Sequence, residues 1–539
     1  MSQLIKQSHA STGVPLWKSE SAISGGSFTA EYPDIWAGSP PTTTDDAINR
    51  LSMLLYARTV LNGTLSELTP QSKIIVNSDN VLLGAEAFVV KYKTSGEAEW
   101  FARLGGSVST DIATDVDIDA SGNVVACGSY ATNPLVVFNA DGSTFSTLPV
   151  DTIFVVKYNA SGVVQWATRM GGSIRCISAD ASGNVLIGGT YTNNPLTIFN
   201  ADGTTFGTLA NSGGNDAFIV KINPTGTVQW ATRISGTGFD ECRGITADST
   251  GNIYATGDYA GTITIFNSDG TTFTTQSSLG SDDSFLIKYT PAGMGIWATK
   301  MGGTGAENVN ECVATPSGDV YLGGRFPGTM TLFNADGTIG GTITSRGGTD
   351  GYIAKYNSLG FFQWVVQQGG SSNDRIQDLS VDGVGNVYGA GDFAGSILIS
   401  NADGSTFTTL VSLGSADAYV VKYNPSGLCL WATQLSSLGD DFTPNIAVDG
   451  DGNAIVCLRT SGSNLLSFDS DKRLFKSYTS LGGNETYLVK YNTNGFGVWT
   501  TGISGTGNEE MPGLGANSMG IVASGSYTSL PLFIRSAGL

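Results

Sequence analysis

Carboxylates recur at a fixed distance after tryptophan through most of this chain. Five lie ten residues after a tryptophan, and a sixth lies eleven residues after one. If the chain forms a ring of equivalent units, equal offsets become equivalent positions, so we expect the six to gather at one mouth of a central channel. There they would form an acidic ring that binds a cation or a basic segment of a partner; the alternative is that they cap and solvate loops. The six are Asp111, Asp240, Glu307, Asp374, Asp441 and Glu509.

The residue types that catalytic and metal sites need are scarce. His9 is the only histidine, which excludes a Ser-His-Asp triad and any histidine-based metal site in the repeated part of the chain. The acidic loop at 449–453 has Thr460 where an EF-hand needs a bidentate glutamate. We therefore predict a non-catalytic protein with no metal and no cofactor. A hydrolase that uses acidic residues on the channel face, as glycosidases do, is the least favoured alternative.

One stretch of sequence occurs seven times and positions these residues. Each copy has a lysine in an apolar run, a turn, and a tryptophan nine positions after the lysine, from Lys91 and Trp100 to Lys490 and Trp499. Within one unit, residues 376–434, four short segments of alternating apolar residues are separated by turns, which predicts four antiparallel strands. Seven units of this kind predict an all-β, seven-bladed β-propeller of four-stranded blades.

The repeated lysine lies in the middle of a strand, so it needs a partner for its charge. The tryptophans are expected to pack between blades, and the six cysteines to be buried free thiols. We expect the lysines to pair with aspartates of the first strand, namely Asp119, Asp180, Asp248, Asp382 and Asp449.

An insert of about 20 residues separates the second and third strands of each unit. It carries a Phe-Asn-Ala-Asp-Gly motif, as at 138–142, which predicts a β-hairpin on every blade. We expect these hairpins to crown the rim of one face. The first copy begins with third and fourth strands, and the chain ends with the missing first two. The strand at 87–92 is therefore expected to pair with the strand that ends near Tyr527, so that both termini build the last blade.

The first 65 residues differ in composition from the repeats. A Ser/Gly/Pro-rich segment precedes a predicted helix at about 44–61, with carboxylates in its first turn and an apolar stripe of Ile48, Leu51 and Leu55. A short helix of this kind must dock on something. We expect residues 1–65 to be a docking or anchor segment and residues 66–539 to be the propeller.

Charge and hydropathy limit the partners and the location. The net charge of −19 disfavours binding to nucleic acid and to anionic membranes. The polar N-terminus has no apolar signal-peptide region, and no apolar run is long enough to span a bilayer, so we expect a soluble protein without membrane insertion.

The repeat resembles the bacterial and viral seven-bladed β-propeller repeat family. The likeness is carried by Ala-Tyr-Val-Val-Lys-Tyr-Asn-Pro-Ser-Gly at 418–427, by Trp431, and by Val-Asp-Gly-Val-Gly-Asn-Val-Tyr at 381–388, and it extends over roughly residues 85–530. It implies the fold and no shared catalytic residues. Residues 33–44 and the helix after them look like the N-terminal heads of some structural proteins of large DNA viruses and phages.

These two resemblances favour a structural or interaction scaffold. The most specific hypothesis is a virion component, a minor capsid or surface protein whose partners are other structural proteins. The alternative is a carbohydrate-binding adhesin whose glycan sites use aromatic residues of the hairpins. Those aromatic residues are Phe145, Phe206, Phe273 and Phe407.

Overall fold

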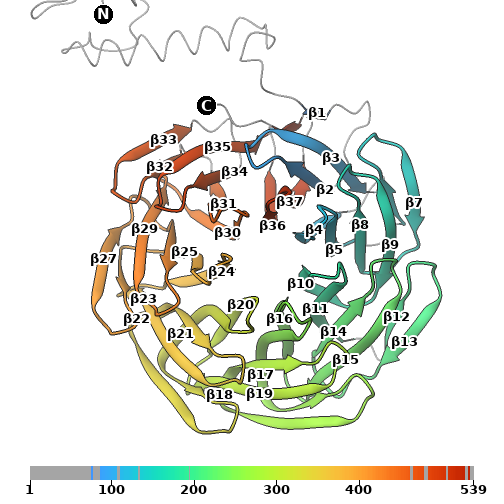
Figure 1. The fold of residues 1–539 in the computed structure, drawn as a ribbon, viewed down its shortest axis with the longest axis horizontal. Helices are drawn as coiled ribbons and strands as arrows, with labels where there is room; N and C mark the ends of the chain where they lie inside the picture. Colours follow the sequence, from blue (N-terminus) through green and yellow to red (C-terminus); the bar gives the residue numbers. More distant parts are fainter. Residues whose placement is uncertain are drawn as a thin grey trace, which may run out of the picture. The chain divides into compact units, whose positions relative to one another are not determined.

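Each copy of the repeat folds into four antiparallel strands, as the alternating apolar residues predict. The computed structural model describes residues 74–76, 85–105, 110–130, 134–192, 195–461, 465–478, 484–504, 508–528 and 532–534. Over these ranges the chain is all β and forms a seven-bladed propeller around a central channel (Figure 1). No helix occurs among the described residues, and therefore none there could cross a membrane. The predicted helix with Ile48, Leu51 and Leu55 lies outside them.

The two inner strands of each blade face and support the channel. The innermost strands are β4 (Ile112–Ile118), β10 (Ser173–Ala179), β16 (Asp240–Ala247), β20 (Asn308–Ala314), β24 (Arg375–Val381), β30 (Asp441–Val448) and β36 (Glu509–Asn517). Each pairs with a second strand, and a β-bulge interrupts every one of these pairs and increases its twist. The second strands are β5 (Val124–Ser129), β11 (Val185–Tyr191), β17 (Ile253–Phe266), β21 (Val320–Phe333), β25 (Val387–Phe393), β31 (Ala454–Ser461) and β37 (Gly520–Tyr527).

The third and fourth strands carry the repeated lysine and tryptophan, which lie opposite each other in the ladder of every blade. The third strands are β2 (Glu86–Tyr92), β8 (Ile153–Tyr158), β14 (Asp216–Ile222), β18 (Thr272–Tyr289), β22 (Ile339–Tyr356), β28 (Asp417–Tyr423) and β34 (Asn484–Tyr491). The fourth strands are β3 (Ala98–Gly105), β9 (Val164–Met170), β15 (Val228–Gly236), β19 (Gly295–Gly303), β23 (Phe362–Gly370), β29 (Cys429–Ser436) and β35 (Gly497–Ser504).

The insert hairpins are present, but the expectation that they crown one face is wrong. Each hairpin pairs with the fourth strand of the preceding blade and adds two strands to the outer edge of that sheet. The reason is that an uncovered fourth strand would expose unpaired backbone groups. Four hairpins are β6 (Leu135–Phe138) with β7 (Thr144–Leu148), β12 (Leu196–Phe199) with β13 (Thr205–Leu209), β26 (Ser396–Ser400) with β27 (Thr406–Val411), and β32 (Leu465–Phe468) with β33 (Leu474–Tyr478).

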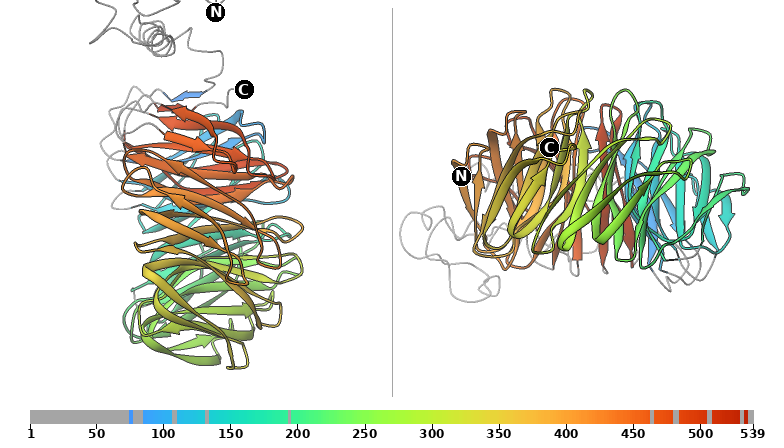
Figure 2. Two further views of the ribbon diagram at one scale, coloured as in Figure 1. Left: turned by 90° about the vertical axis from the view of Figure 1, so that its left-hand side faces the viewer. Right: turned by 90° about the horizontal axis from the view of Figure 1, so that it is seen from below.

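Two other hairpins are continuous with a blade. The long strands β17 and β18 run through one blade and on into a hairpin that pairs with β15 of the blade before it. The strands β21 and β22 likewise run through the next blade and on into a hairpin that pairs with β19. The side views in Figure 2 show these long strands passing obliquely across the ring wall. Every hairpin therefore ties two neighbouring blades together.

The ring closes through both ends of the propeller. The C-terminal strands β36 and β37 share a sheet with β2 and β3, and Glu86 lies opposite Tyr527. The seventh hairpin is also split, because β1 (Ile74–Val76) pairs with β38 (Leu532–Ile534). The sequence-predicted pairing of the strand at 87–92 with the strand ending near Tyr527 is thus present.

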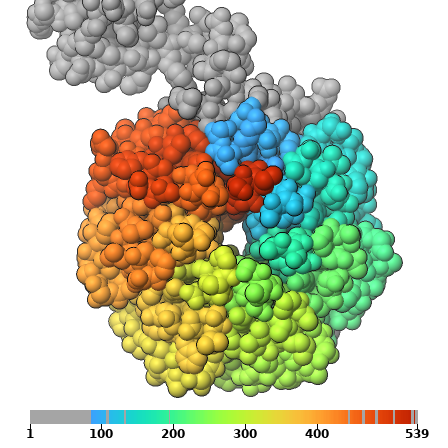
Figure 3. Space-filling model, viewed as in Figure 1, coloured from blue at the N-terminus to red at the C-terminus, as the bar shows by residue number. Residues whose placement is uncertain are grey.

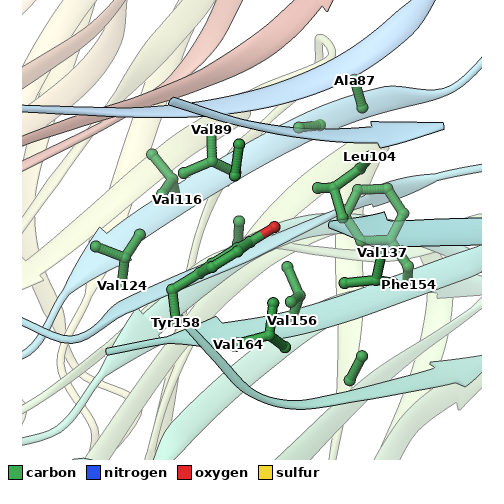
Figure 4. Close-up of a cluster of buried hydrophobic side chains, with 14 of the residues drawn as sticks. Ala87, Val89, Leu104, Val116, Val124, Val137, Phe154, Val156, Tyr158 and Val164 are labelled. Atoms are coloured by element: carbon green, nitrogen blue, oxygen red, sulfur yellow. The ribbon is translucent and has the colours of Figure 1, made fainter. Parts of the chain in front are cut away.

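The core lies between the faces of adjacent blades. In one such layer, Ala87, Val89 and Leu104 of one blade pack against residues of the next, among them Phe154 and Tyr158 (Figure 4). These side chains are fully or almost fully removed from solvent. Burial of this kind stabilises the fold by about 1.5–3 kcal/mol per large apolar side chain. All six cysteines are buried free thiols, as expected.

A hydrogen bond from every repeated tryptophan joins its blade to the next one. Each indole N–H donates to a backbone carbonyl in the turn between the third and fourth strands of the following blade, at 2.9–3.3 Å. Trp499 donates to Thr94 O at 3.3 Å, which joins the last copy of the repeat to the first. The other acceptors are Ala160, Pro224, Pro291, Ser358, Pro425 and Thr493.

The predicted pairing of the repeated lysines with first-strand aspartates is confirmed. The five ion pairs have N–O distances of 2.7–3.8 Å. Where Thr315 replaces the aspartate, Lys355 pairs with Asp319 at 2.9 Å instead. Where Asn517 replaces it, Lys91 pairs with Glu99 at 3.2 Å. The five pairs are Lys157–Asp119, Lys221–Asp180, Lys288–Asp248, Lys422–Asp382 and Lys490–Asp449.

If the ring is closed, Trp499, which joins the last copy of the repeat to the first, should contribute as much to stability as a tryptophan between two other blades. Trp499→Phe and Trp297→Phe each remove one inter-blade hydrogen bond, and each should lower the free energy of unfolding by about 1–2 kcal/mol. The measurement is urea denaturation of the two single variants beside the unmodified protein. A Trp499→Phe variant as stable as the unmodified protein, with Trp297→Phe destabilised, would show that the seam is open in solution.

Candidate functional site

The six carboxylates predicted to form an acidic ring occupy equivalent places in the structure. Each lies at the start of the innermost strand of its blade or directly before it. All six are buried, with at most 1% of the side chain exposed. None of the six lines the central cavity described below. The residues are Asp111, Asp240, Glu307, Asp374, Asp441 and Glu509.

Their hydrogen bonds show a local structural role. Glu307 Oε2 accepts from the backbone N–H of Gly303 at 2.8 Å, and Asp374 Oδ2 accepts from Gly370 N at 2.8 Å. In both cases the donor lies four residues earlier, where the chain leaves the fourth strand. Glu307 and Asp374 therefore cap the loops that lead from one blade to the next. That the six form a ring that binds a cation or a basic segment of a partner remains a prediction.

Sequence reasoning missed a second buried carboxylate at the same junctions. It lies five residues before the repeated lysine, so its regular position in the repeat could have revealed it from the sequence. It also accepts from a backbone N–H four residues earlier, as in Asp283 Oδ2 with Leu279 N at 2.8 Å and Asp417 Oδ2 with Leu413 N at 2.7 Å. Four junctions thus hold two neighbouring buried carboxylates, namely Asp216 with Asp240, Asp283 with Glu307, Asp350 with Asp374, and Asp417 with Asp441.

Burial gives these pairs unusual proton affinity. Loss of solvent, with repulsion from the neighbouring carboxylate added, raises the pKa of Asp240, Glu307, Asp374 and Asp441 to about 7 in each case. One oxygen of Asp216, Asp283, Asp350 and Asp417 has no hydrogen-bond partner among the described residues. Near neutral pH each pair can therefore hold one proton between its two carboxyl groups.

The central channel contains a polar cavity of about 490 Å³. Residues of all seven innermost strands line it, and Figure 3 shows the opening at the centre of the ring. Carboxylates in its wall connect adjacent blades, because Asp115 Oδ2 accepts from Ile177 N at 2.9 Å and Asp378 Oδ2 accepts from Ile446 N at 2.6 Å. The same wall carries four arginines. Among the described residues, no group of three or more Asp, Glu, His or Cys side chains is arranged to hold a metal ion.

The outer perimeter has a second kind of cavity, where hairpins of adjacent blades meet. One of about 590 Å³ is lined by Phe206, the edge of Trp230, Gln229 and Asp269. Of the four hairpin aromatic residues predicted to contact glycans, Phe145, Phe206 and Phe407 are 41–43% exposed. Phe273 differs, because it packs against a blade core.

Comparisons with known proteins agree with this fold. A family model described as a beta-propeller repeat matches residues 229–258, from β15 into β17. A relative from Acanthamoeba polyphaga mimivirus, the WD repeat-containing protein L264, is 26% identical over 465 residues, which are 75% of this chain and 33% of the relative. The regulatory protein FlaEY of Caulobacter vibrioides is 26% identical over 276 residues, 50% of this chain and 26% of the relative. The chain thus spans a third or less of the length of these relatives.

Among solved structures, the WD40 domain of Neurospora crassa Pan2 is similar to this chain. It is 9% identical with a TM-score of 0.34, and the match covers 78% of this chain and 90% of that domain. In sequence, the chain is similar to the beta-propeller repeat model and to a viral WD repeat-containing protein.

The raised pKa values predict a specific dependence of stability on pH. A carboxyl group with a pKa near 7 in the folded chain binds its proton more tightly there than in the unfolded chain. Its contribution to stability is complete below about pH 4 and is lost as the pH rises to 7. The free energy of unfolding of the unmodified protein should therefore fall between pH 5 and pH 8. In a variant with all four groups replaced, this fall should be smaller by ~2 kcal/mol or more. The four substitutions are Asp240→Asn, Glu307→Gln, Asp374→Asn and Asp441→Asn.

Denaturant titrations at the two pH values measure this difference. The control is Asp202→Asn in an exposed hairpin turn, where a hydrogen bond from Thr204 lowers the pKa, so the pH 5–8 difference should not change. If the fourfold variant loses as much stability between pH 5 and pH 8 as the unmodified protein, the buried pairs do not take up protons.

Proposed function

We propose that this protein is a non-catalytic interaction scaffold and a component of a virus particle, as a minor capsid or surface protein. The observation that supports an interaction role is a row of exposed apolar side chains at one position of five blades. Each directly follows the glycine in the turn between the third and fourth strands, so all lie at the same end of their blades. They are Val163, Met294, Phe361, Leu428 and Phe496, with 36–50% of their surface exposed.

This row is suited to a partner that contacts several blades at once. Single exposed apolar residues are common, but a set repeated at one end of a ring offers a partner several equivalent contacts. A partner that covers several equivalent spots gains avidity from contacts that are weak one by one. Other structural proteins of a capsid or surface assembly, which are themselves present in many copies, are partners of this kind.

A role in a virus particle is supported by two likenesses. One is the mimivirus relative, which matches 75% of this chain. The other is the sequence likeness of residues 33–44 and the predicted helix after them to heads of viral structural proteins. In this proposal residues 1–65 anchor the protein and residues 66–539 form the propeller. The stripe of Ile48, Leu51 and Leu55 stabilises by several kcal/mol only when a partner or the ring covers it, at about 1.5–3 kcal/mol per buried side chain.

Two variants test the anchor and the apolar row separately. A chain that begins at Ser66 should keep its thermal stability but fail to enter particles, because the propeller is complete without the head. Phe361→Ser with Leu428→Ser should also keep stability within about 0.5 kcal/mol, since both side chains are exposed, and should reduce incorporation. The measurement is quantitative mass spectrometry of particles purified through two density gradients.

The control for the row is Leu438→Ser, which removes an apolar side chain that is 86% exposed in the connection from β29 to β30, at the opposite end of the blades. It should enter particles normally. Absence of the unmodified protein from purified particles would end the virion hypothesis, and normal incorporation of the chain that begins at Ser66 would end the anchor hypothesis.

Carbohydrate binding is the second candidate, supported by the perimeter cavity. Phe206 presents an exposed ring beside Gln229 and Asp269, and sugars bind to aromatic faces flanked by polar groups. Phe145 and Phe407 repeat this exposure on other hairpins.

A glycan array decides between this candidate and the scaffold alone. If the perimeter binds sugars, Phe145→Ala, Phe206→Ala and Phe407→Ala together should weaken binding at least tenfold, because stacking on each ring is lost. Phe361→Ser is the matched control, an aromatic residue that lies outside the hairpins and should leave binding unchanged. No binding to any glycan by the unmodified protein would exclude this function.

A further inference from the structure

Four arginines from consecutive blades line the central cavity. Arg175, Arg243 and Arg375 project from the innermost strands β10, β16 and β24, and Arg325 comes from the second strand β21. The four arginines therefore lie on one side of the cavity, in a chain whose net charge is −19. The three other blades contribute no arginine to the cavity wall.

Three of the four guanidinium groups are paired with carboxylates. Glu241 bonds to Arg175 and lies 2.9 Å from Arg243 Nη2. Asp258 Oδ2 lies 2.6 Å from Arg243 Nε. In the next blade but one, Asp392 Oδ1 accepts from Arg375 Nε at 2.6 Å. These arginines are therefore neutralised and held in place by neighbours.

Arg325 differs from the other three. Its Nε donates to Asn308 Oδ1 at 3.2 Å, and among the described residues no carboxylate lies within 4.0 Å of its guanidinium group. The flanking blades carry aspartates at the same position of the second strand, Asp258 and Asp392. Asp258 is already used by Arg243 and by hydrogen bonds from Asn308 and Val309.

The surroundings make this unpaired charge costly. Partial burial, followed by repulsion from Arg375 and Arg243, lowers the pKa of Arg325, and attraction from Asp258 and Asp392 offsets only part of this effect. Removing a charge from water without a counter-ion destabilises a protein. A bound anion would supply the counter-charge that Arg325 lacks and would offset its repulsion from Arg243 and Arg375.

We propose that the central cavity binds the oxyanion group of a small molecule, a phosphate or a carboxylate, on the guanidinium group of Arg325, flanked by Arg243 and Arg375. The planar donor fork of arginine fits either group with two parallel hydrogen bonds. A cavity of about 490 Å³ is within the size range of small-molecule sites. The site is independent of the perimeter surfaces considered above.

Four carboxylates in the same cavity wall do not neutralise this site. Asp115 and Asp378 accept backbone N–H groups of the neighbouring blades, as described above, and Asp117 accepts from Ala179 N at 2.9 Å. Glu311 Oε1 accepts from Cys312 N at 2.8 Å. Burial raises the pKa of Asp115 and Glu311 well above the ordinary range and that of Asp378 to about 7, which decreases their repulsion of an anion near neutral pH. Burial raises the pKa of Asp117 to about 6, so this carboxyl group stays mostly charged there.

Isothermal titration of the full chain at low salt tests the proposal, with sodium phosphate and sodium citrate as separate probes. We expect one site per chain for at least one probe, and the probe that binds more tightly identifies the oxyanion. Arg325→Gln should weaken that binding about tenfold or more, as expected for loss of a charge-assisted pair. Arg325→Lys keeps the charge without the fork and should give an intermediate loss.

Arg459→Gln is the matched control. It occupies the same strand position two blades further on, pairs with Glu510 at 2.6 Å, and does not line the cavity. Its binding should equal that of the unmodified protein. Absence of binding to both probes, unchanged binding by Arg325→Gln, or an equal loss in Arg459→Gln would each overturn the proposal. If Arg325→Gln does not fold, the Arg325→Lys variant provides the test. Full affinity of this variant for the anion would contradict binding through the guanidinium group, and a clear loss of affinity would support it.

Discussion

The hydrogen bond from each repeated tryptophan to the turn of the next blade is the constraint on which this structure depends. It sets the angle and spacing between blades, because a large rigid side chain and a fixed backbone acceptor must meet seven times around one axis. The turn below the indole needs glycine. Gly162 has a φ of +79°, and a Cβ there would lie 3.0 Å from the ring of Trp100. The repeated lysine anchors the same region from within the blade through its ion pair.

The hairpins add a second connection between adjacent blades. Each pairs with the fourth strand of the preceding blade, and its turn also binds the blade to which it belongs. Asn139 Oδ1 accepts from Val164 N at 2.8 Å, which explains the asparagine of the repeated motif. A blade junction is thus held by an apolar layer, an indole hydrogen bond and a hairpin bridge. Rigid rings with repeated surface features are well suited to contacts with several partners, whereas catalysis requires a particular arrangement of reactive groups at one place.

Buried charge is distributed in two ways that bear on function. At the blade junctions, paired carboxylates have raised pKa values and exchange protons near neutral pH. In the channel, Arg175, Arg243 and Arg375 are paired with neighbouring carboxylates, whereas Arg325 is not. The junctions therefore affect how stability depends on pH, while the channel is where an anion is bound. The exposed apolar row and the perimeter cavities are separate from both.

The sequence by itself determined the repeat, the four strands of each blade, the lysine–aspartate pairs and the split of the last blade between the termini. The strands follow from local periodicity, since alternating side chains and turn residues lie within a few positions of one another. The ion pairs and the split blade follow from the repeat, because each copy places the same residue types at equivalent positions. Only the tertiary structure decided that hairpins extend the preceding blade, that Asp216 lies beside Asp240, and that four arginines meet in one cavity. Successive arginines of this group are 50 to 82 residues apart in the chain, so their meeting depends on how neighbouring sheets stack, which no local pattern encodes.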